Sequence, residues 1–208
     1  MKISTDPRIR ILVDKRLEEM NASGLMKCLD VPPDMATGPQ DQEGWIPWRA
    51  IPSTITPQQI ATLQIDLGYR LPSLFVDLLL YKHFLELDYD EIKFLPLPSN
   101  EGINAVRKWV ETESNFFNLL QKGYVIFALS QNDESYYCFM VNYPQQIQGT
   151  TSIDYPVVLW NPTDKINSRG KLVFNSFADL VESLTADSLS PAWNDSSYST
   201  GINVQPLP

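Results

Sequence analysis

The order of hydrophobic patterns along the chain predicts an α+β fold, in which helices pack on an antiparallel sheet of about four or more strands. Apolar residues recur at helical spacing in several segments of the first 120 residues. After Gly123 the pattern changes to short runs rich in aromatic and β-branched residues, which are typical of strands. One amphipathic stretch follows them. Helices, then a meander, then a helix is the order of an α+β domain.

Composition favours a globular chain whose partner is a protein. Apolar residues make up 43% of the 208 positions and charged residues 20%, which suits one packed core. The formal net charge of −9 disfavours nucleic-acid phosphates and anionic membranes as partners. It favours a basic protein, because opposite net charges speed encounter. The start of the chain has no apolar signal-peptide run, and no run reaches transmembrane length, so we expect a cytoplasmic protein.

The first 44 residues predict one helix and a linker. Residues 5–24 have Asp6 as a cap, Pro7 in the first turn and an apolar stripe from Ile9 to Met20. Residues 29–44 are rich in Pro, Gly and Asp, which marks the clearest boundary in the chain. We therefore divide the chain into residues 1–44 (helix and linker), 45–186 (α+β domain) and 187–208 (tail).

Two further helices are predicted before residue 86. The first follows Thr56, which forms a capping box with Gln59, and it can end at Gly68. The second opens at Pro72 and is apolar over most of its circumference as far as Leu85, which indicates burial on two sides. His83, the only histidine, falls near its end. A lone histidine there is expected to serve packing or hydrogen bonding rather than catalysis.

The remaining elements alternate in type. Residues 87–99 are expected to be extended, and residues 99–120 helical with Ser99 or Asn100 as the cap. Four strands and a closing helix capped by Ser176 follow. The strands are expected within residues 124–130, 135–142, 155–161 and 171–174, and the helix within residues 175–184.

The sequence lacks the residue combinations that most catalytic mechanisms need, so we expect no enzyme, no cofactor and no metal site. One histidine and two distant cysteines, Cys28 and Cys138, do not make a zinc site, and no phosphate-binding glycine loop is present. Carboxylate chemistry stays open as a hydrolase or a calcium site, because acidic residues gather in two clusters. A solvated loop is the simpler interpretation of each. The clusters are Asp88, Asp90, Glu91 and Asp133, Glu134.

Two tryptophans stand out as binding candidates. Trp45 and Trp48 flank Pro47 in a segment that prolines keep extended, and an aromatic side chain in such a segment can be half exposed. Exposed aromatic residues mark binding sites. The other tryptophans of the domain are expected in the core.

Four segments, in order, resemble the SUKH superfamily of Smi/Knr-like domains over residues 45–186. The joint between the helices matches through Leu67, Gly68, Leu71 and Pro72. The hairpin, the strand after it and the closing helix match through a second set of residues. That set is Phe127, Ala128, Tyr136, Tyr137, Pro156, Val157, Trp160, Asp164, Ser176, Phe177 and Leu180. The polar residues 131–134 stand where the family hairpin has glycines.

The resemblance implies a non-enzymatic binding domain with no shared catalytic residues. Many bacterial members resemble immunity proteins (antitoxins) that neutralise a toxin, often a nuclease. On that reading, a face formed by the two acidic clusters occludes a basic toxin. An alternative is a scaffold or regulatory domain that recognises an endogenous or cell-wall-related partner through Trp45 and Trp48. A carboxylate-based hydrolase is the third alternative.

Overall fold

The structure, a computed structural model, describes residues 5–116, 119–146, 152–162 and 170–186. The predicted tail, residues 187–208, and Asp164 of the family pattern lie outside the described residues. The helices are α1 (Pro7–Ala22), α2 (Pro57–Leu67), α3 (Ser73–Tyr81), α4 (Ile103–Phe116), the 3₁₀ turn η1 (Leu120–Lys122) and α5 (Phe177–Thr185). The strands are β1 (Lys27–Cys28), β2 (Ile46–Pro47), β3 (Ile51–Pro52), β4 (Lys82–His83), β5 (Asp88–Tyr89), β6 (Ile92–Phe94), β7 (Tyr124–Ser130), β8 (Tyr136–Met140), β9 (Gln145–Gln146), β10 (Ile153–Asp154), β11 (Val157–Trp160) and β12 (Lys171–Phe174).

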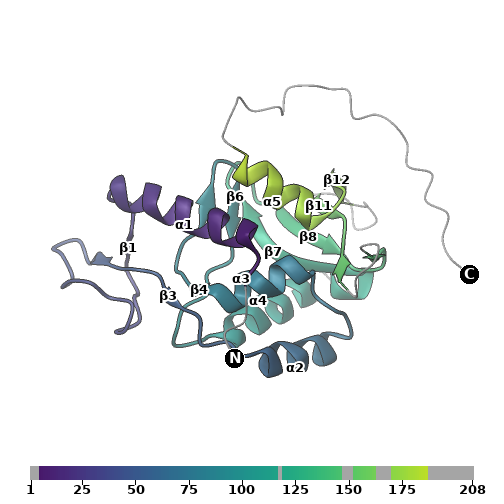
Figure 1. Ribbon diagram of the computed structural model, residues 1–208, viewed down its shortest axis with the longest axis horizontal. Helices are drawn as coiled ribbons and strands as arrows, with labels where there is room; N and C mark the ends of the chain where they lie inside the picture. Colours follow the sequence, from purple (N-terminus) through teal and green to yellow (C-terminus); the bar gives the residue numbers. More distant parts are fainter. Residues whose placement is uncertain (1–4, 117–118, 147–151, 163–169, 187–208) are drawn as a thin grey trace, which may run out of the picture.

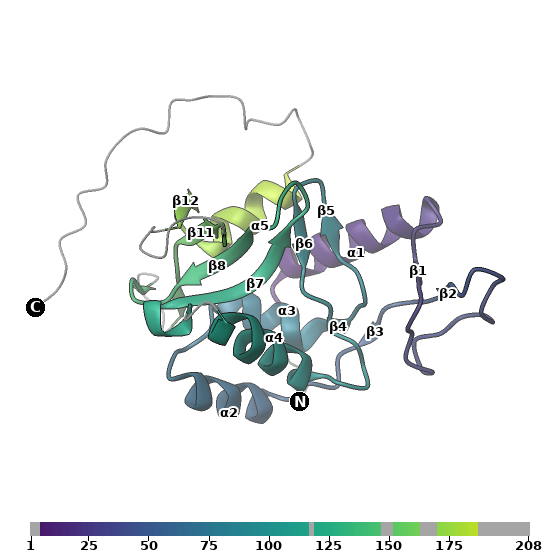
Figure 2. The ribbon, with the colours of Figure 1, turned by 180° about the vertical axis from the view of Figure 1, so that it is seen from behind.

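A six-stranded antiparallel sheet forms the centre of the fold, which confirms the α+β prediction. Its strand order is β12-β11-β8-β7-β6-β5. Four of these strands fall within the predicted segments, and β5 and β6 come from the predicted extended stretch. Figure 1 shows α1 and α5 side by side over the sheet, and Figure 2, from behind, shows α4 along β7 with α2 beyond it.

Aromatic rings join the sheet to the helices. Phe127 of β7 and Phe139 of β8 stack with their centroids 4.2 Å apart. Phe75 of α3 and Phe177 of α5 meet this pair edge-on, at 5.2 and 5.3 Å from Phe139. Edge-to-face packing of this kind adds to the stabilisation from burial alone. The start of α5 is fixed by the buried Asp154, whose carboxylate accepts the N–H groups of Phe177 and Ala178 at 2.9 and 3.1 Å.

The N-terminal helix belongs to the same core. Its apolar stripe is buried together with residues of α3, α5 and the sheet. Polar contacts fasten it as well: the Lys82 ammonium and the Tyr81 hydroxyl both donate to the Asp14 carboxylate, each at 2.7 Å. The Tyr89 hydroxyl donates to the Leu12 carbonyl. The body of the protein therefore includes α1, whereas the division of the chain at residue 44 stays a prediction.

One helix is shorter than the sequence predicts. The helix expected to reach Leu85 ends at Tyr81, because Lys82 and His83 leave it to pair with Pro52 and Ile51. Leu85 is still buried. Apolar periodicity does not distinguish a buried helix from the buried strand that follows it, since both present continuous hydrophobic residues.

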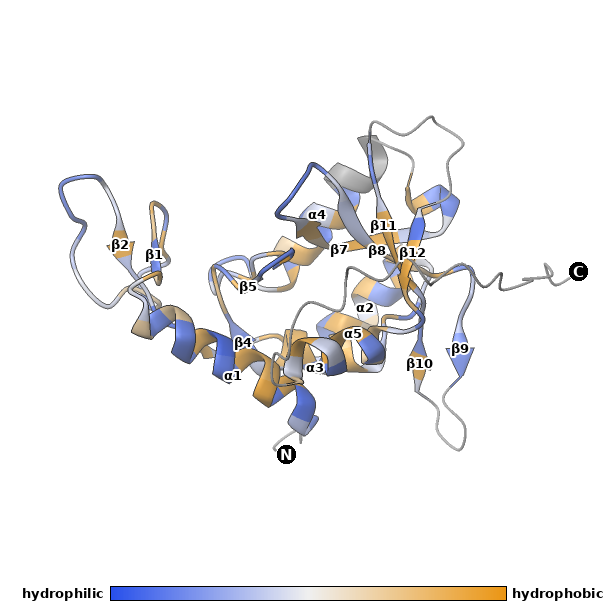
Figure 3. Ribbon diagram, turned by 90° about the horizontal axis from the view of Figure 1, so that it is seen from above, coloured by the Kyte–Doolittle hydropathy of each residue, from blue (hydrophilic) through white to orange (hydrophobic). Residues whose placement is uncertain are grey.

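Residues 25–49, which we call the arm, extend from the end of α1. The arm contains the antiparallel pair β1–β2, and a bridge between Ala36 and Trp48 adds a third segment. Figures 1 and 3 show it projecting beyond the C-terminal end of α1, away from the sheet. The segment expected to be a linker is thus a small folded unit.

Candidate functional site

The structure brings the two acidic clusters together at one end of the sheet. The β5–β6 turn carries Asp90 and Glu91, and the β7–β8 turn carries Asp133 and Glu134. Gln131 joins the two turns: its backbone N–H donates to the Glu91 carbonyl at 3.0 Å, and its side-chain amide donates to the Tyr89 carbonyl at 2.7 Å. Figure 2 shows both turns at the upper end of the sheet.

We call Asp90, Glu91, Asp133 and Glu134 the acidic tip. Asp90, Asp133 and Glu134 are exposed and Glu91 is half-buried. Among the described residues, these four carboxylates form no ion pair. The tip is therefore a local concentration of negative charge that the body leaves uncompensated.

Titration effects agree with this proximity. Burial raises the pKa of Tyr137 to about 12, and the charges of Glu91 and Asp133 add to the shift. Partial burial opposes ionisation of Asp133, but hydrogen bonds from Ser135 and Ser130 outweigh it and lower the pKa of Asp133. Asp133 thus stays ionised at neutral pH, and one carboxylate from each turn acts on the same tyrosine.

Asp88 is separate from the tip in its chemistry. Its carboxylate accepts a hydrogen bond from the Lys93 ammonium at 3.2 Å, and Glu86 lies 3.5 Å from the same ammonium. The Arg16 guanidinium donates to the Asp88 carbonyl and lies over the Tyr89 ring. Asp88 therefore helps to fasten α1 and β5, and much of its charge is compensated within the fold.

The two tryptophans differ in exposure. Trp48 is 3% exposed and packs in the main core with Met35, whereas Trp45 is 39% exposed near the far end of the arm. Alternation along β2 explains the difference, because successive side chains of a strand point to opposite faces. Sequence reasoning missed Leu25 and Leu29, which are 56% and 60% exposed on the same arm. Residues 25–29 read Leu-Met-Lys-Cys-Leu, which does not alternate between apolar and polar residues, so the sequence held no signal for the exposure of these two leucines.

His83 lies in the interior and is held by the backbone. It is fully buried, its Nε2 accepts the Thr54 N–H at 2.9 Å, and its Nδ1 lies 3.1 Å from the Leu97 carbonyl oxygen. Burial lowers the pKa of His83, while the bond to Leu97 and the charge of Asp34 act in the opposite direction. These contacts give His83 the packing and hydrogen-bonding role expected from the sequence.

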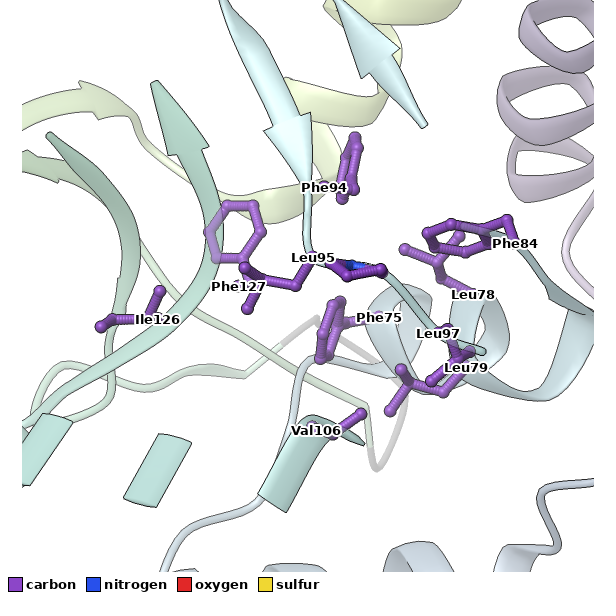
Figure 4. A pocket seen from close by; sticks show the side chains of 11 residues that line it. Phe75, Leu78, Leu79, Phe84, Phe94, Leu95, Leu97, Val106, Ile126 and Phe127 are labelled. Carbon is purple, nitrogen blue, oxygen red and sulfur yellow. The ribbon is translucent and has the colours of Figure 1, made fainter. Parts of the chain in front are cut away.

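The described part of the chain shows little evidence of a site for a metal ion or a small ligand. It contains no group of three or more His, Cys, Asp or Glu side chains arranged to hold a metal ion. Cys28 and Cys138 are free thiols there, and burial raises the pKa of both. A cavity of about 20 Å³ between α3, β6 and β7 is lined by apolar side chains such as Phe75, Leu79 and Val106 (Figure 4). Its size is that of about one water molecule, so we interpret it as a packing defect.

Comparison with known proteins identifies the family. Residues 54–183 match the model described as the SMI1 / KNR4 family (SUKH-1), which covers more than half of the chain and excludes α1 and the arm. Domains of this family are, in general, protein-binding immunity or regulatory domains without catalysis. No curated protein matches the chain. No helix among the described residues has the length and apolar character that crossing a membrane requires.

Proposed function

The chain belongs to the SMI1 / KNR4 family (SUKH-1), and from this premise we propose that it is an immunity protein that binds a basic toxin through the acidic tip. The acidic tip covers a basic surface of the toxin and blocks the toxin's substrate-binding groove. No chemical step is required of this chain. The family supports the protein-binding role, and the toxin as partner is the specific part of the proposal.

One observation carries the assignment of the surface: two sequence-distant turns are joined so that four carboxylates lie together without cationic partners among the described residues. Such a surface attracts a basic protein from a distance and orients it during encounter. The hydrogen bonds that Gln131 donates to the Tyr89 and Glu91 carbonyls hold the turns in place before binding. Little conformational ordering is then needed when the partner arrives.

The test compares two charge-reversal variants as baits in a lysate of the native organism. The tip variant carries Asp90→Lys and Glu134→Lys, and the control variant carries Glu18→Lys and Glu101→Lys. All four positions are exposed, and both variants change the net charge equally. The wild type and the control variant should retain one basic, toxin-like protein at an ionic strength of about 0.05 M and release it at about 0.5 M.

The tip variant should bind that protein at least about tenfold more weakly at low salt, and its binding should depend less on salt. Equal binding by the tip and control variants would remove the acidic tip from the proposal. The regulatory alternative makes a different prediction: the captured protein would be an endogenous or wall-related one, retained by the tip variant. The exposed Trp45 favours that alternative as the second candidate.

A further inference from the structure

The arm is anchored firmly to the body although it projects from it. Met26, Val31, Met35 and Trp48 are buried in the main core. The Ser99 hydroxyl, just before α4, donates to the Asp34 carboxylate at 2.6 Å. The arm is therefore a fixed extension of the domain, and its outer face has a defined position relative to the sheet.

The outer face of the arm is apolar. In and beside the β1–β2 pair, Met26, Cys28, Ile46 and Trp48 are buried or half-buried. The alternate residues Leu25, Lys27, Leu29, Trp45 and Arg49 are exposed and face outward. Three of these outward residues are large apolar side chains with much of their surface in water. They are Leu25, Leu29 and Trp45, which we call the arm patch. Figure 3 shows this pair of strands beyond the end of α1, with the rest of the molecule on one side only.

The backbone around Trp45 is fixed before any partner binds. The Asp41 carboxylate accepts the Trp45 N–H at 2.9 Å and the Glu43 N–H at 3.1 Å, and the Asp41 N–H donates to the Trp45 carbonyl at 2.9 Å. Leu29 lies beside this turn, since a Cβ placed on Gly44 would be 3.6 Å from Leu29 Cδ2. A rigid aromatic residue with an aliphatic neighbour is typical of an interface hot spot.

Charge distinguishes the two ends of the arm patch. Asp30 follows Leu29 and Glu43 lies two residues before Trp45; both are exposed, and neither forms an ion pair among the described residues. The Lys27 ammonium is paired with the Asp41 carboxylate at 3.3 Å and adds little net charge. The exposed Arg49 lies at the other end of the pair, one residue after Trp48, whose N–H donates to the Met26 carbonyl at 3.0 Å. The end that carries Trp45 and Leu29 is thus apolar with an acidic rim.

We propose that the arm patch is a second docking surface, which binds a segment of a partner protein carrying an aliphatic or aromatic residue flanked by Lys or Arg. The apolar residue packs on Trp45 and Leu29, and the flanking cations meet Asp30 and Glu43. A second copy of this chain fits poorly, because it presents the same acidic rim. Three side chains also fall short of the roughly 800 Å² per partner that a stable interface buries. The surface contains no residue of the acidic tip, so it goes beyond the proposed function.

The test uses a displayed library of random linear peptides selected on the full chain. Counter-selection uses a variant with Leu29→Ser and Trp45→Ser, and Ile65→Ser is the matched control because Ile65 is 79% exposed on α2. Thermal denaturation shows that each variant is folded. Enriched peptides should share an apolar residue flanked by Lys or Arg. Their affinity should fall at least about tenfold in the double variant and stay unchanged in the Ile65 control.

A second variant keeps the apolar residues and tests the rim. Glu43→Lys should weaken the same peptides severalfold and reduce the salt dependence of their binding. Three results would overturn the proposal. They are the absence of any peptide that depends on Leu29 and Trp45, a consensus without cations, and dimerisation of the wild type that the double variant abolishes in light scattering.

Discussion

Replacing His83 by Leu should destabilise the fold and remove its pH dependence near neutrality. The Thr54 amide can only donate, so Nε2 is the acceptor and Nδ1 carries the proton that goes to the Leu97 carbonyl. Leucine makes neither bond. The Leu97 carbonyl keeps its bond from the Phe84 N–H at 3.2 Å, but the Thr54 N–H loses its partner. The Thr54 hydroxyl, 2.9 Å from Nε2, loses its partner as well. Together these losses reduce the free energy of unfolding by about 2–4 kcal/mol.

The pH effect follows from the lowered pKa of His83. The folded state holds the ring neutral, whereas the unfolded chain protonates it near pH 6.5, so the unfolded state binds more protons below that pH. Stability is therefore fully present above about pH 6.5 and is lost as pH falls toward the folded pKa. The loss is at most about 1.4 kcal/mol per pH unit. Asp77 and Asp154, whose pKa values burial raises, act with the opposite sign, because their contribution to stability is lost as pH rises from 3.8.

Urea unfolding at about pH 7.5 and about pH 5.5 measures both effects, because the free energy of unfolding falls linearly with urea. The wild type should lose stability between the two values, and His83→Leu should start lower and lose much less. The variant His83→Asn places an amide N–H near Nδ1 and should recover part of the stability at neutral pH without recovering the pH dependence. A wild-type stability that is flat over this range, or a slope that persists in the leucine variant, would refute the assignment of this pH dependence to the buried His83.

Three further substitutions test the local interactions, each by urea unfolding against wild type. Asp154→Ala removes the acceptor of three backbone N–H groups, including those that start α5, and should cost about 3 kcal/mol, whereas the exposed Asp179→Ala should cost far less. Gly123→Ala should cost about 1–2 kcal/mol, because φ is +80° and the new Cβ would lie 2.1 Å from the Asn142 side chain; adding Asn142→Ala should relieve only the contact. Thr56→Ala breaks the capping box of α2 and should cost about 1 kcal/mol, and no loss would mean that the cap is dispensable.

Local signals predicted the elements whose ends are set by neighbouring residues. Thr56 accepts the Gln59 N–H and Gly68 adopts the left-handed conformation, as the capping pattern indicated. Ser176 likewise accepts the Asp179 N–H at 3.0 Å. These contacts span three or four residues, so the sequence contains all the information that they need. The end of α3 depends instead on pairing with Ile51 and Pro52, about thirty residues away, and helical periodicity gave no sign of it.

The candidate site was predictable in its charges but not in its arrangement. The close spacing of acidic residues along the sequence identified the two clusters. The pattern of the flanking strands indicated that each cluster lies at a turn. That the turns lie side by side depends on the pairing of β6 with β7, which brings Ile92 opposite Ser130. The different roles of Asp88 and Asp90 depend on Lys93, a neighbour across the β5–β6 turn. The arm escaped prediction because Pro and Gly in residues 29–44 are typical of linkers, whereas here they form the turns of a small sheet.

In both proposed surfaces, the residues that fix the backbone conformation differ from the residues whose side chains face a partner. At the acidic tip, Gln131 holds the two turns through carbonyl oxygens, and the carboxylates of Asp90 and Glu134 make no ion pair in the described structure. In the arm, Asp41 holds the turn through backbone N–H groups, and Trp45 offers its side chain outward. Substitution of the outward residues should therefore change partner choice with little effect on stability. A binding domain built in this way can change its specificity while α3, α5 and the sheet keep the same core.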